Sequence, residues 1–150
     1  MNIDYIKNCY KVAGYTGNDM TNFIPNVIKS DSLIVVGICP STKTGKIKTN
    51  SRHNLETWMA EAEVKAWDFQ NVIPHKINCI DEDEVFYDLL EDRLLPFSKV
   101  IALGGFVSKV LKKIGIPHLQ IYHPSTRNRA LNSKENHVKT VKMIKKYLND

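Results

Sequence analysis

Four short apolar runs alternate along the chain with longer segments in which apolar residues recur every three or four positions. Runs of the first kind predict buried strands, and segments of the second kind predict amphipathic helices. The predicted strands are 33–36, 67–73, 100–103 and 118–122, and the predicted helices are 3–13, 54–64, 84–95, 106–114 and 134–148. Because strand and helix alternate four times, we expect an α/β fold, a three-layer α/β/α sandwich with a central four-stranded parallel sheet.

The segments that follow the four predicted strands are the places to look for a site. In parallel sheets, ligands bind beyond the carboxyl ends of the strands. In this chain those ends are followed by residues 37–41, 71–75, 104–105 and 123–128. They contain glycines, prolines, an asparagine and a histidine, which are residue types suited to tight turns and polar contacts.

The composition is that of an ordinary globular domain. The 150 residues are 43% hydrophobic and 25% charged, which predicts one domain over residues 1–150. No apolar run is long enough to cross a bilayer and the first residues do not form a signal peptide, so we expect a cytoplasmic protein without membrane contact. Cys9, Cys39 and Cys79 are widely spaced and odd in number. They predict no metal site, no disulfide framework and no cofactor.

The charge is modestly positive and unevenly distributed. Twenty-one Lys and Arg against sixteen Asp and Glu give a net charge of +5, which suits a polyanionic partner without requiring one. Acidic residues gather at 81–84 and 91–92, so we expect the two signs on different faces; a merely solvated lysine surface is the alternative. The basic residues form two groups, Lys43, Lys46, Lys48 and Arg52 in the first, and Lys109, Lys112, Lys113, Arg127, Arg129 and Lys134 in the second.

Three of the strand ends carry residues that could bind a ligand or take part in a reaction. His123 follows the fourth predicted strand, close to two arginines, and could act on an anionic or nucleotide substrate. Asn71 closes the second strand, and its amide can both donate and accept a hydrogen bond at the edge of a base, although it could equally cap a turn. Gly37 opens the segment 37–41, where the backbone could approach a ligand closely. An ordinary turn is the alternative there.

Taken together, these strand-end segments resemble the uracil-DNA glycosylase superfamily. The motifs are Gly-Ile-Cys-Pro-Ser (37–41), Asn-Val-Ile-Pro (71–74), Val-Ile-Ala-Leu-Gly-Gly (100–105) and His-Pro-Ser (123–125), and the similarity spans residues 33–129. Members of that superfamily flip a deoxyuridine or damaged nucleotide out of DNA and hydrolyse its N-glycosidic bond. The resemblance implies a monomeric DNA glycosylase that acts on uracil or a modified pyrimidine in single- or double-stranded DNA.

The resemblance also implies roles for individual residues. His123 would stabilise the departing base anion, and a neutral imidazole can supply the donor that this requires. Asn71 would read the base, and segment 37–41 would line the sugar and the attacking water. Among these, Cys39 and Ser41 are further catalytic candidates. The other base-binding candidates are Gly37, Ile38, Pro40 and His53, and the DNA-binding candidates are Lys43, Lys46, Ser125, Arg127, Asn128 and Arg129.

Two departures from the family pattern keep other functions open. Cys39 stands where family members carry an aspartate or asparagine that positions water, and a thiol is a poor hydrogen-bonding substitute. The expected stacking aromatic is absent between the first motif and the next helix, where only His53 could stack. The three cysteines also exclude the four-cysteine iron-sulfur branch. One alternative is a non-catalytic protein that binds DNA or a nucleotide, and another is an enzyme that acts on free nucleotides or hypermodified bases.

The remaining aromatic side chains receive structural interpretations. Trp58 and Trp67 fall within apolar patterns and are predicted to lie in the core. His118 and His137 are predicted to lie on the surface.

Overall fold

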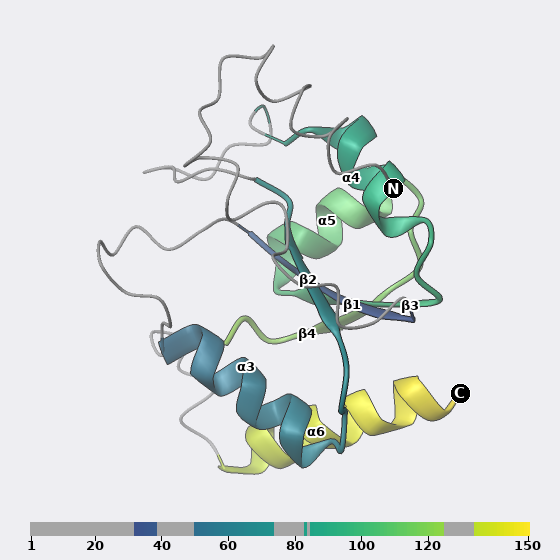
Figure 1. Ribbon diagram of the computed structural model, residues 1–150. Helices are drawn as coiled ribbons and strands as arrows, with labels where there is room; N and C mark the ends of the chain where they lie inside the picture. The colour runs from purple at the N-terminus through teal and green to yellow at the C-terminus, as the bar shows by residue number, and fades with distance from the viewer. Residues whose placement is uncertain (1–31, 39–49, 74–82, 84, 125–133) are drawn as a thin grey trace.

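A parallel four-stranded sheet lies between two layers of helices in the computed structural model, which describes residues 32–38, 50–73, 83, 85–124 and 134–150 (Figure 1). The strands are β1 (Leu33–Gly37), β2 (Asp68–Asn71), β3 (Lys99–Leu103) and β4 (Leu119–Ile121). Their order across the sheet is β2-β1-β3-β4, and every neighbouring pair is parallel. The predicted fold class is therefore confirmed.

In the described part of the chain, two helices cover each face of this sheet (Figure 1). The helices are α3 (Asn50–Glu61), α4 (Tyr87–Leu94), α5 (Gly105–Lys113) and α6 (Lys134–Asn149). One layer consists of α4 and α5, and the other of α3 and α6. The helix predicted over residues 3–13 lies outside the described residues.

The strand order reverses direction at the centre of the sheet. From β1 the chain passes through α3 to β2 on one side, whereas from β3 it passes through α5 to β4 on the other side. The topological switch point therefore lies between β1 and β3, and in open α/β sheets this is where ligands bind. Gly37 ends β1 and Gly104 follows β3, so a glycine stands on each side of the switch point.

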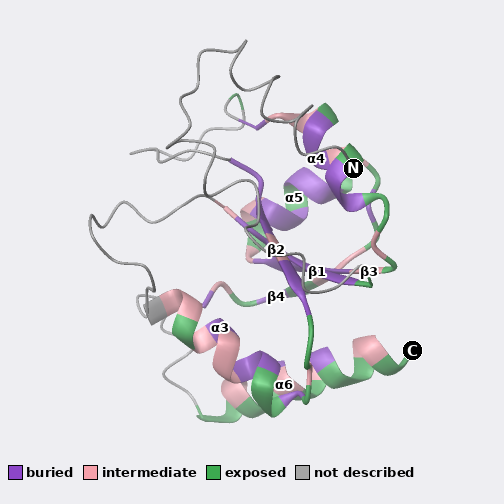
Figure 2. Cartoon of the chain, viewed as in Figure 1, coloured by how far each residue is buried: buried purple, intermediate pink, exposed green. Residues whose placement is uncertain are grey.

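The core is built from alternate strand residues that face opposite layers. Ile34 and Val36 pack in the α4/α5 layer, while Leu33 and Val35 pack in the α3/α6 layer. All five β1 residues are buried, as the continuous aliphatic run predicted (Figure 2). The predicted core positions of both tryptophans are also confirmed, since Trp58 is 2% exposed and Trp67 is 8% exposed.

Element ends differ from the prediction by a few residues, and hydrogen bonds explain two of the differences. Helix α3 stops at Glu61 because Glu63 adopts a left-handed φ of 62° and Val64 N–H donates back to Met59 O at 2.9 Å. Strand β2 is shorter than predicted, yet its pairing continues, since the Val72 N–H donates to the Gly37 carbonyl at 2.9 Å. Helix α5 ends where Gly115 predicted, with that glycine at φ 73°.

A buried ion pair joins α4 to β2. Arg93 Nη2 lies 2.6 Å from Asp68 Oδ2, with side-chain exposures of 9% and 2%. The other carboxylate oxygen accepts a hydrogen bond from the Phe69 N–H at 2.9 Å. Both oxygens of the buried carboxylate thus have donors, as a buried charge requires.

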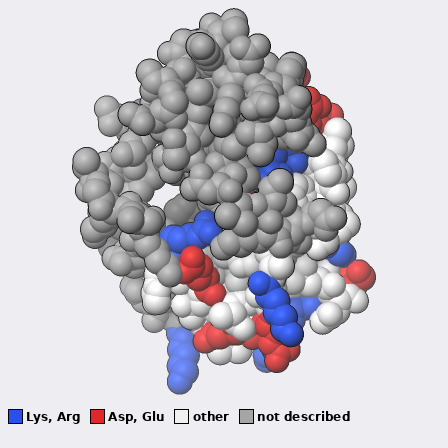
Figure 3. All heavy atoms as spheres, viewed as in Figure 1, with Lys and Arg blue, Asp and Glu red and all other residues white. Residues whose placement is uncertain are grey.

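Acidic and basic side chains occur within the same helical layer. Helix α4 carries the acidic residues Glu91 and Asp92, yet it shares one layer with the lysine-bearing α5. The Lys113 ammonium group of α5 lies 5.1 Å from the centre of the Tyr87 ring of α4. Both signs also occur together on the face in Figure 3. The predicted separation onto different faces stays a prediction, because many members of the acidic and basic groups lie outside the described residues.

Within the part of the chain that the structure describes, no helix combines the length and apolar composition needed to span a bilayer.

Candidate functional site at the carboxyl ends of the strands

Four strand ends form a row along one edge of the sheet. Asn71 ends β2 and pairs in register with Gly37 of β1, Gly104 follows β3, and His123 lies two residues beyond β4. Neighbouring strands are about 4.8 Å apart, so the backbones of Asn71 and His123 are roughly 14 Å apart along the row. Among the described residues of this row, Gly37 and Gly104 lie between these two polar side chains and leave its floor to the backbone.

Gly37 provides the space that the Asn71 amide occupies. A Cβ atom at Gly37 would lie 2.8 Å from Asn71 Oδ1 and 2.8 Å from Phe69 Cζ. Both distances are too short for any larger residue without displacement of a neighbour. Asn71 is only 6% exposed, so its amide is held at a defined position next to the end of β1.

Gly104 has the corresponding role beside His123. Its φ of 89° lies in the left-handed region, and a Cβ atom there would lie 3.3 Å from His123 Cβ. The Gly104 N–H donates to Ile121 O at 2.9 Å, which ties the end of β3 to the end of β4. The imidazole is thereby held against the switch point.

The protein environment keeps His123 neutral. Burial removes water from the imidazole and lowers its pKa below the ordinary value of 6.5. At neutral pH the ring therefore presents one N–H donor and one lone pair rather than a positive charge. This is the protonation state that the proposed hydrogen-bond donor needs.

The amino-terminal half of α3 lies beside the same strand ends. Asn54 Nδ2 donates to Pro124 O at 3.0 Å, which links the helix to the segment after His123. Two residues earlier, the Arg52 guanidinium lies 4.9 Å from the centre of the Phe69 ring and 4.6 Å from that of Trp67. Contacts of this kind orient the cation against the aromatic faces.

Phe69 and Arg52 are the residues of this region whose roles the sequence did not reveal. The family pattern predicts an aromatic group in the segment after the first motif, whereas Phe69 lies on β2. A usable signal was present, because Phe69 precedes Asn71 by two positions and side chains two apart on a strand share a face. The sequence indicated Arg52 only as a member of a basic group, since its aromatic partners Trp67 and Phe69 are distant in sequence.

The structure describes only part of the predicted site. It brings Gly37, Asn71 and His123 into one row. His53 is exposed on α3, and no hydrogen bond found between described residues joins it to Asn71 or His123. Ile38 packs in the α4/α5 layer, so its side chain lies on the face opposite to Phe69 rather than in the predicted base pocket. The residues that lie outside the described ranges are Cys39, Pro40, Ser41, Lys43, Lys46, Ser125, Arg127, Asn128 and Arg129.

His118 hydrogen-bonds to partners within the fold, which corrects its predicted surface position. It is half-buried, with Nδ1 at 2.8 Å from Ile116 O and Nε2 at 2.7 Å from Ser108 Oγ. The carbonyl can only accept, so Nδ1 carries the hydrogen and Nε2 accepts from the Ser108 hydroxyl.

His137 is half-buried as well, and it links α6 to α3. Trp58 Nε1–H donates to its Nδ1 at 3.2 Å, so the ring's hydrogen is on Nε2, which bonds Glu61. With its side chain 34% exposed, His137 lies at the surface as predicted, and its ring also joins two elements.

No group of three or more His, Cys, Asp or Glu side chains that could hold a metal ion occurs among the described residues. All three cysteines lie outside those residues, so the predicted absence of a metal site or cluster stays a prediction. No model of a known protein family matches the chain, and no curated protein matches it. The likeness to uracil-DNA glycosylases therefore depends on the four motifs and on where the strands place them.

Proposed function

We propose that this protein is a DNA glycosylase that hydrolyses the N-glycosidic bond of uracil or a modified pyrimidine flipped out of DNA. The observation that carries the proposal is the row at the switch point, with Asn71 at one end, His123 at the other and glycines between them. A flat base could lie over the glycine backbone and meet a polar side chain at each end. Enzymes that act on bases use such pockets for a nucleotide taken out of the stack.

Asn71 would recognise the base. Its amide offers one acceptor and two donors, which suits the alternating carbonyl and N–H groups of a pyrimidine edge. Because the side chain is buried beside Gly37, little conformational freedom is lost when the base binds.

His123 would stabilise the leaving group. When the bond between the sugar carbon and the base nitrogen breaks, its electron pair goes to the base, and negative charge develops on a base oxygen. Water adds to the sugar carbon and releases a proton, so the products are the free base and an abasic sugar. A neutral imidazole N–H directed at the base oxygen lowers the barrier, and one such preorganised donor contributes roughly 10²- to 10³-fold in rate.

Phe69 and Arg52 would form the wall of the base pocket. The Phe69 ring is half-buried beside Gly37, and the guanidinium of Arg52 lies over it. This pair supplies an aromatic surface near Asn71. The first motif and the segment after it contain no aromatic residue that could do so, apart from His53. A base held there would be enclosed on one side by apolar surface.

A non-catalytic DNA- or nucleotide-binding protein is the second candidate. It is favoured by one observation, the thiol of Cys39 at the position where members of the uracil-DNA glycosylase superfamily carry a water-positioning aspartate or asparagine. Such a protein would keep the pocket and lose hydrolysis. The variant Cys39→Asp separates the two, because a gain of base excision would identify a decayed enzyme.

The test of the proposed activity is a panel of oligonucleotides that carry uracil, mismatches or modified pyrimidines, scored for alkali-labile abasic sites. We expect the parent to produce abasic sites on at least one substrate. His123→Ala should lower the single-turnover rate by roughly 10²- to 10³-fold, while DNA binding is retained. Asn71→Ala should lower the single-turnover rate of base excision and reduce the preference for one base over another.

Two matched variants control for indirect effects. Asn149→Ala removes an exposed asparagine at the end of α6, and His118→Asn changes a histidine in the other layer. Both should retain the parent rate if circular dichroism shows a folded protein. Equal rates for the parent, His123→Ala and Asn71→Ala would show that the site is assigned wrongly.

A further inference from the structure

A pocket of about 480 Å³ opens beside the candidate site, between the end of β4, the start of α5 and α6. Its size lies within the roughly 300–1,000 Å³ range of small-molecule sites. Gly104 and His123 form part of its wall, so the pocket and the candidate base site share two residues. The strand-end motifs account for Gly104, Gly105 and His123, whereas the other residues of this pocket lie outside those motifs.

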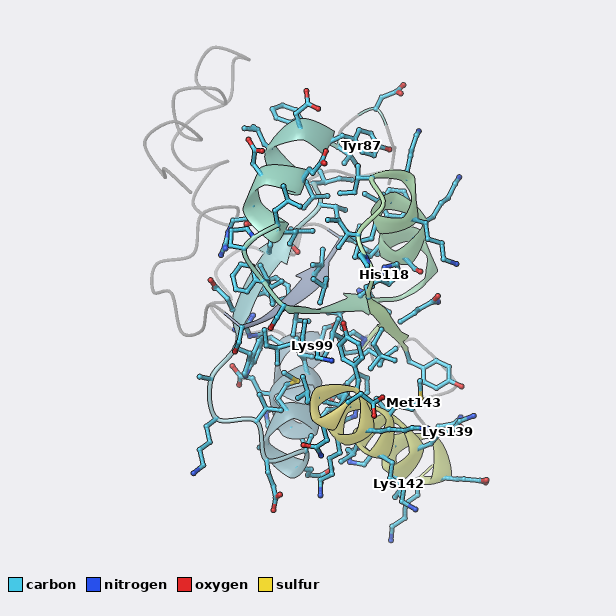
Figure 4. All side chains as sticks on the ribbon, turned by 90° about the vertical axis from the view of Figure 1, so that its right-hand side faces the viewer. Tyr87, Lys99, His118, Lys139, Lys142 and Met143 are labelled. Carbon is cyan, nitrogen blue, oxygen red and sulfur yellow. The ribbon has the colours of Figure 1, made fainter. Side chains whose placement is uncertain are left out.

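The apolar part of the wall suits a flat aromatic ligand. Tyr122 lines the pocket and is 36% exposed, which is unusual for a large aromatic side chain in the described part of the chain. Met143 of α6 lines it as well, and a thioether packs well against aromatic rings. Figure 4 shows Met143 and Lys139 close together on α6.

The charged part of the wall suits an anion. Lys139 is exposed and lines the pocket, and no Asp or Glu is among the described residues that line it. On α6, Lys142 and Lys146 follow Lys139 at spacings of three and four residues, which places the three ammonium groups along one side of the helix. A cationic ligand would therefore be repelled at this pocket.

We propose that this pocket binds a nucleotide, with the base stacked on Tyr122 and the phosphate paired with Lys139. An aromatic ring and an anionic group are the two features that the wall can recognise together. The identity of this nucleotide rests on the proposed function, under which it would be a neighbour of the flipped nucleotide in the same DNA strand. A free nucleotide has the same chemistry and is the other possible source.

The test measures binding without excision. One arm uses a fluorescein-labelled single-stranded thymidine oligonucleotide that contains no uracil, followed by fluorescence anisotropy. The other arm uses thymidine monophosphate, followed by isothermal titration calorimetry. Tyr122→Ala should weaken binding about 5- to 100-fold, while Tyr122→Phe, which keeps the ring, should bind like the parent. Lys139→Ala should lower the slope of log affinity against log salt by about 0.7 in the oligonucleotide arm.

Lys145→Ala is the matched control, since Lys145 is an exposed lysine of α6 that does not line the pocket. Binding in the first arm alone identifies a strand nucleotide, and equal dependence on Tyr122 in both arms identifies a free nucleotide. If Tyr122→Ala and Lys139→Ala bind both ligands like the Lys145→Ala variant, the inference is wrong. Tyr122-dependent binding by a protein that excises no base would overturn only the proposed function.

Discussion

The two faces of the sheet are built alike along most of their length and differ at the carboxyl ends of the strands. In β1, the residues that face the α4/α5 layer are Ile34 and Val36, and the next residue on that face, Ile38, also packs there. On the α3/α6 face, Leu33 and Val35 are followed by Gly37. On the α4/α5 face, β1 therefore carries apolar side chains to its end, whereas on the α3/α6 face it ends in a glycine.

The same change occurs on the neighbouring strand. On the α3/α6 face of β2, the aromatic Phe69 is followed by Asn71, and the two side chains meet beside Gly37. On the other face the order is reversed, since the buried polar residues Asp68 and Gln70 are followed by the apolar Val72. A site thus arises where the core pattern stops on one face only, because the opposite layer still holds the strands in place. Stability and candidate chemistry are divided between the two faces.

The largest expected effect concerns the face without the site. Arg93→Met keeps most of the side-chain volume but leaves the buried Asp68 carboxylate without its partner. Breaking a buried pair in this way should lower the free energy of unfolding by about 3–5 kcal/mol. Urea unfolding followed by circular dichroism measures the change.

The matched control is the half-exposed pair between Arg52 and Glu56 in α3, whose Nε–Oε1 distance is 3.3 Å. Glu56→Gln should change the free energy of unfolding by less than about 1 kcal/mol. If the two variants lost similar amounts of unfolding free energy, the buried ion pair on the α4/α5 face would be no more important for stability than the half-exposed pair on α3.

A smaller effect is expected at the strand end that carries the site. Gly37→Ala places a methyl group 2.8 Å from Asn71 Oδ1 and from Phe69 Cζ. Displacement of these groups should cost about 1–3 kcal/mol of stability and should also weaken base excision, because Asn71 moves. Thermal unfolding and the abasic-site assay measure the two consequences.

Gly105→Ala is the control for the loss of glycine itself. A Cβ atom at Gly105 would meet only the Gln120 Nε2 atom, at 3.9 Å, which is an ordinary contact distance. Its thermal stability should match that of the parent or exceed it slightly. If the Gly37→Ala variant were as stable and as active as the parent, the close packing of Asn71 and Phe69 against Gly37 would be contradicted.

The smallest effect is a dependence of stability on pH that arises from His123. Burial lowers the pKa of the folded imidazole below 6.5, so the unfolded chain binds a proton at this residue first as the pH falls. The contribution to stability is fully present above about pH 6.5 and is lost as the pH falls toward the folded pKa. Urea midpoints between neutral and mildly acidic pH should therefore fall more steeply for the parent than for His123→Asn. A ring titration by NMR with a midpoint at or above 6.5 would contradict this.

Local sequence pattern determined much of this fold. The aliphatic runs around Val35 and Ile101 predicted strands buried on both faces, because alternate side chains in such runs are apolar in both directions. Gly115 marked the end of α5, since a glycine accepts the left-handed conformation that ends a helix. The alternation of strand and helix then led to the parallel sandwich. It also placed Gly37, Asn71 and His123 at strand ends.

Only the tertiary structure decided which of these ends are neighbours. The strand order, the switch point between Gly37 and Gly104, and the contact of Phe69 with the end of β1 all depend on pairing between distant segments. The bond between Arg93 and Asp68 and the pocket beside Tyr122 depend on it as well. Periodicity along a chain records which residues become buried, whereas the partners of a buried side chain are chosen by packing and strand register across the whole fold.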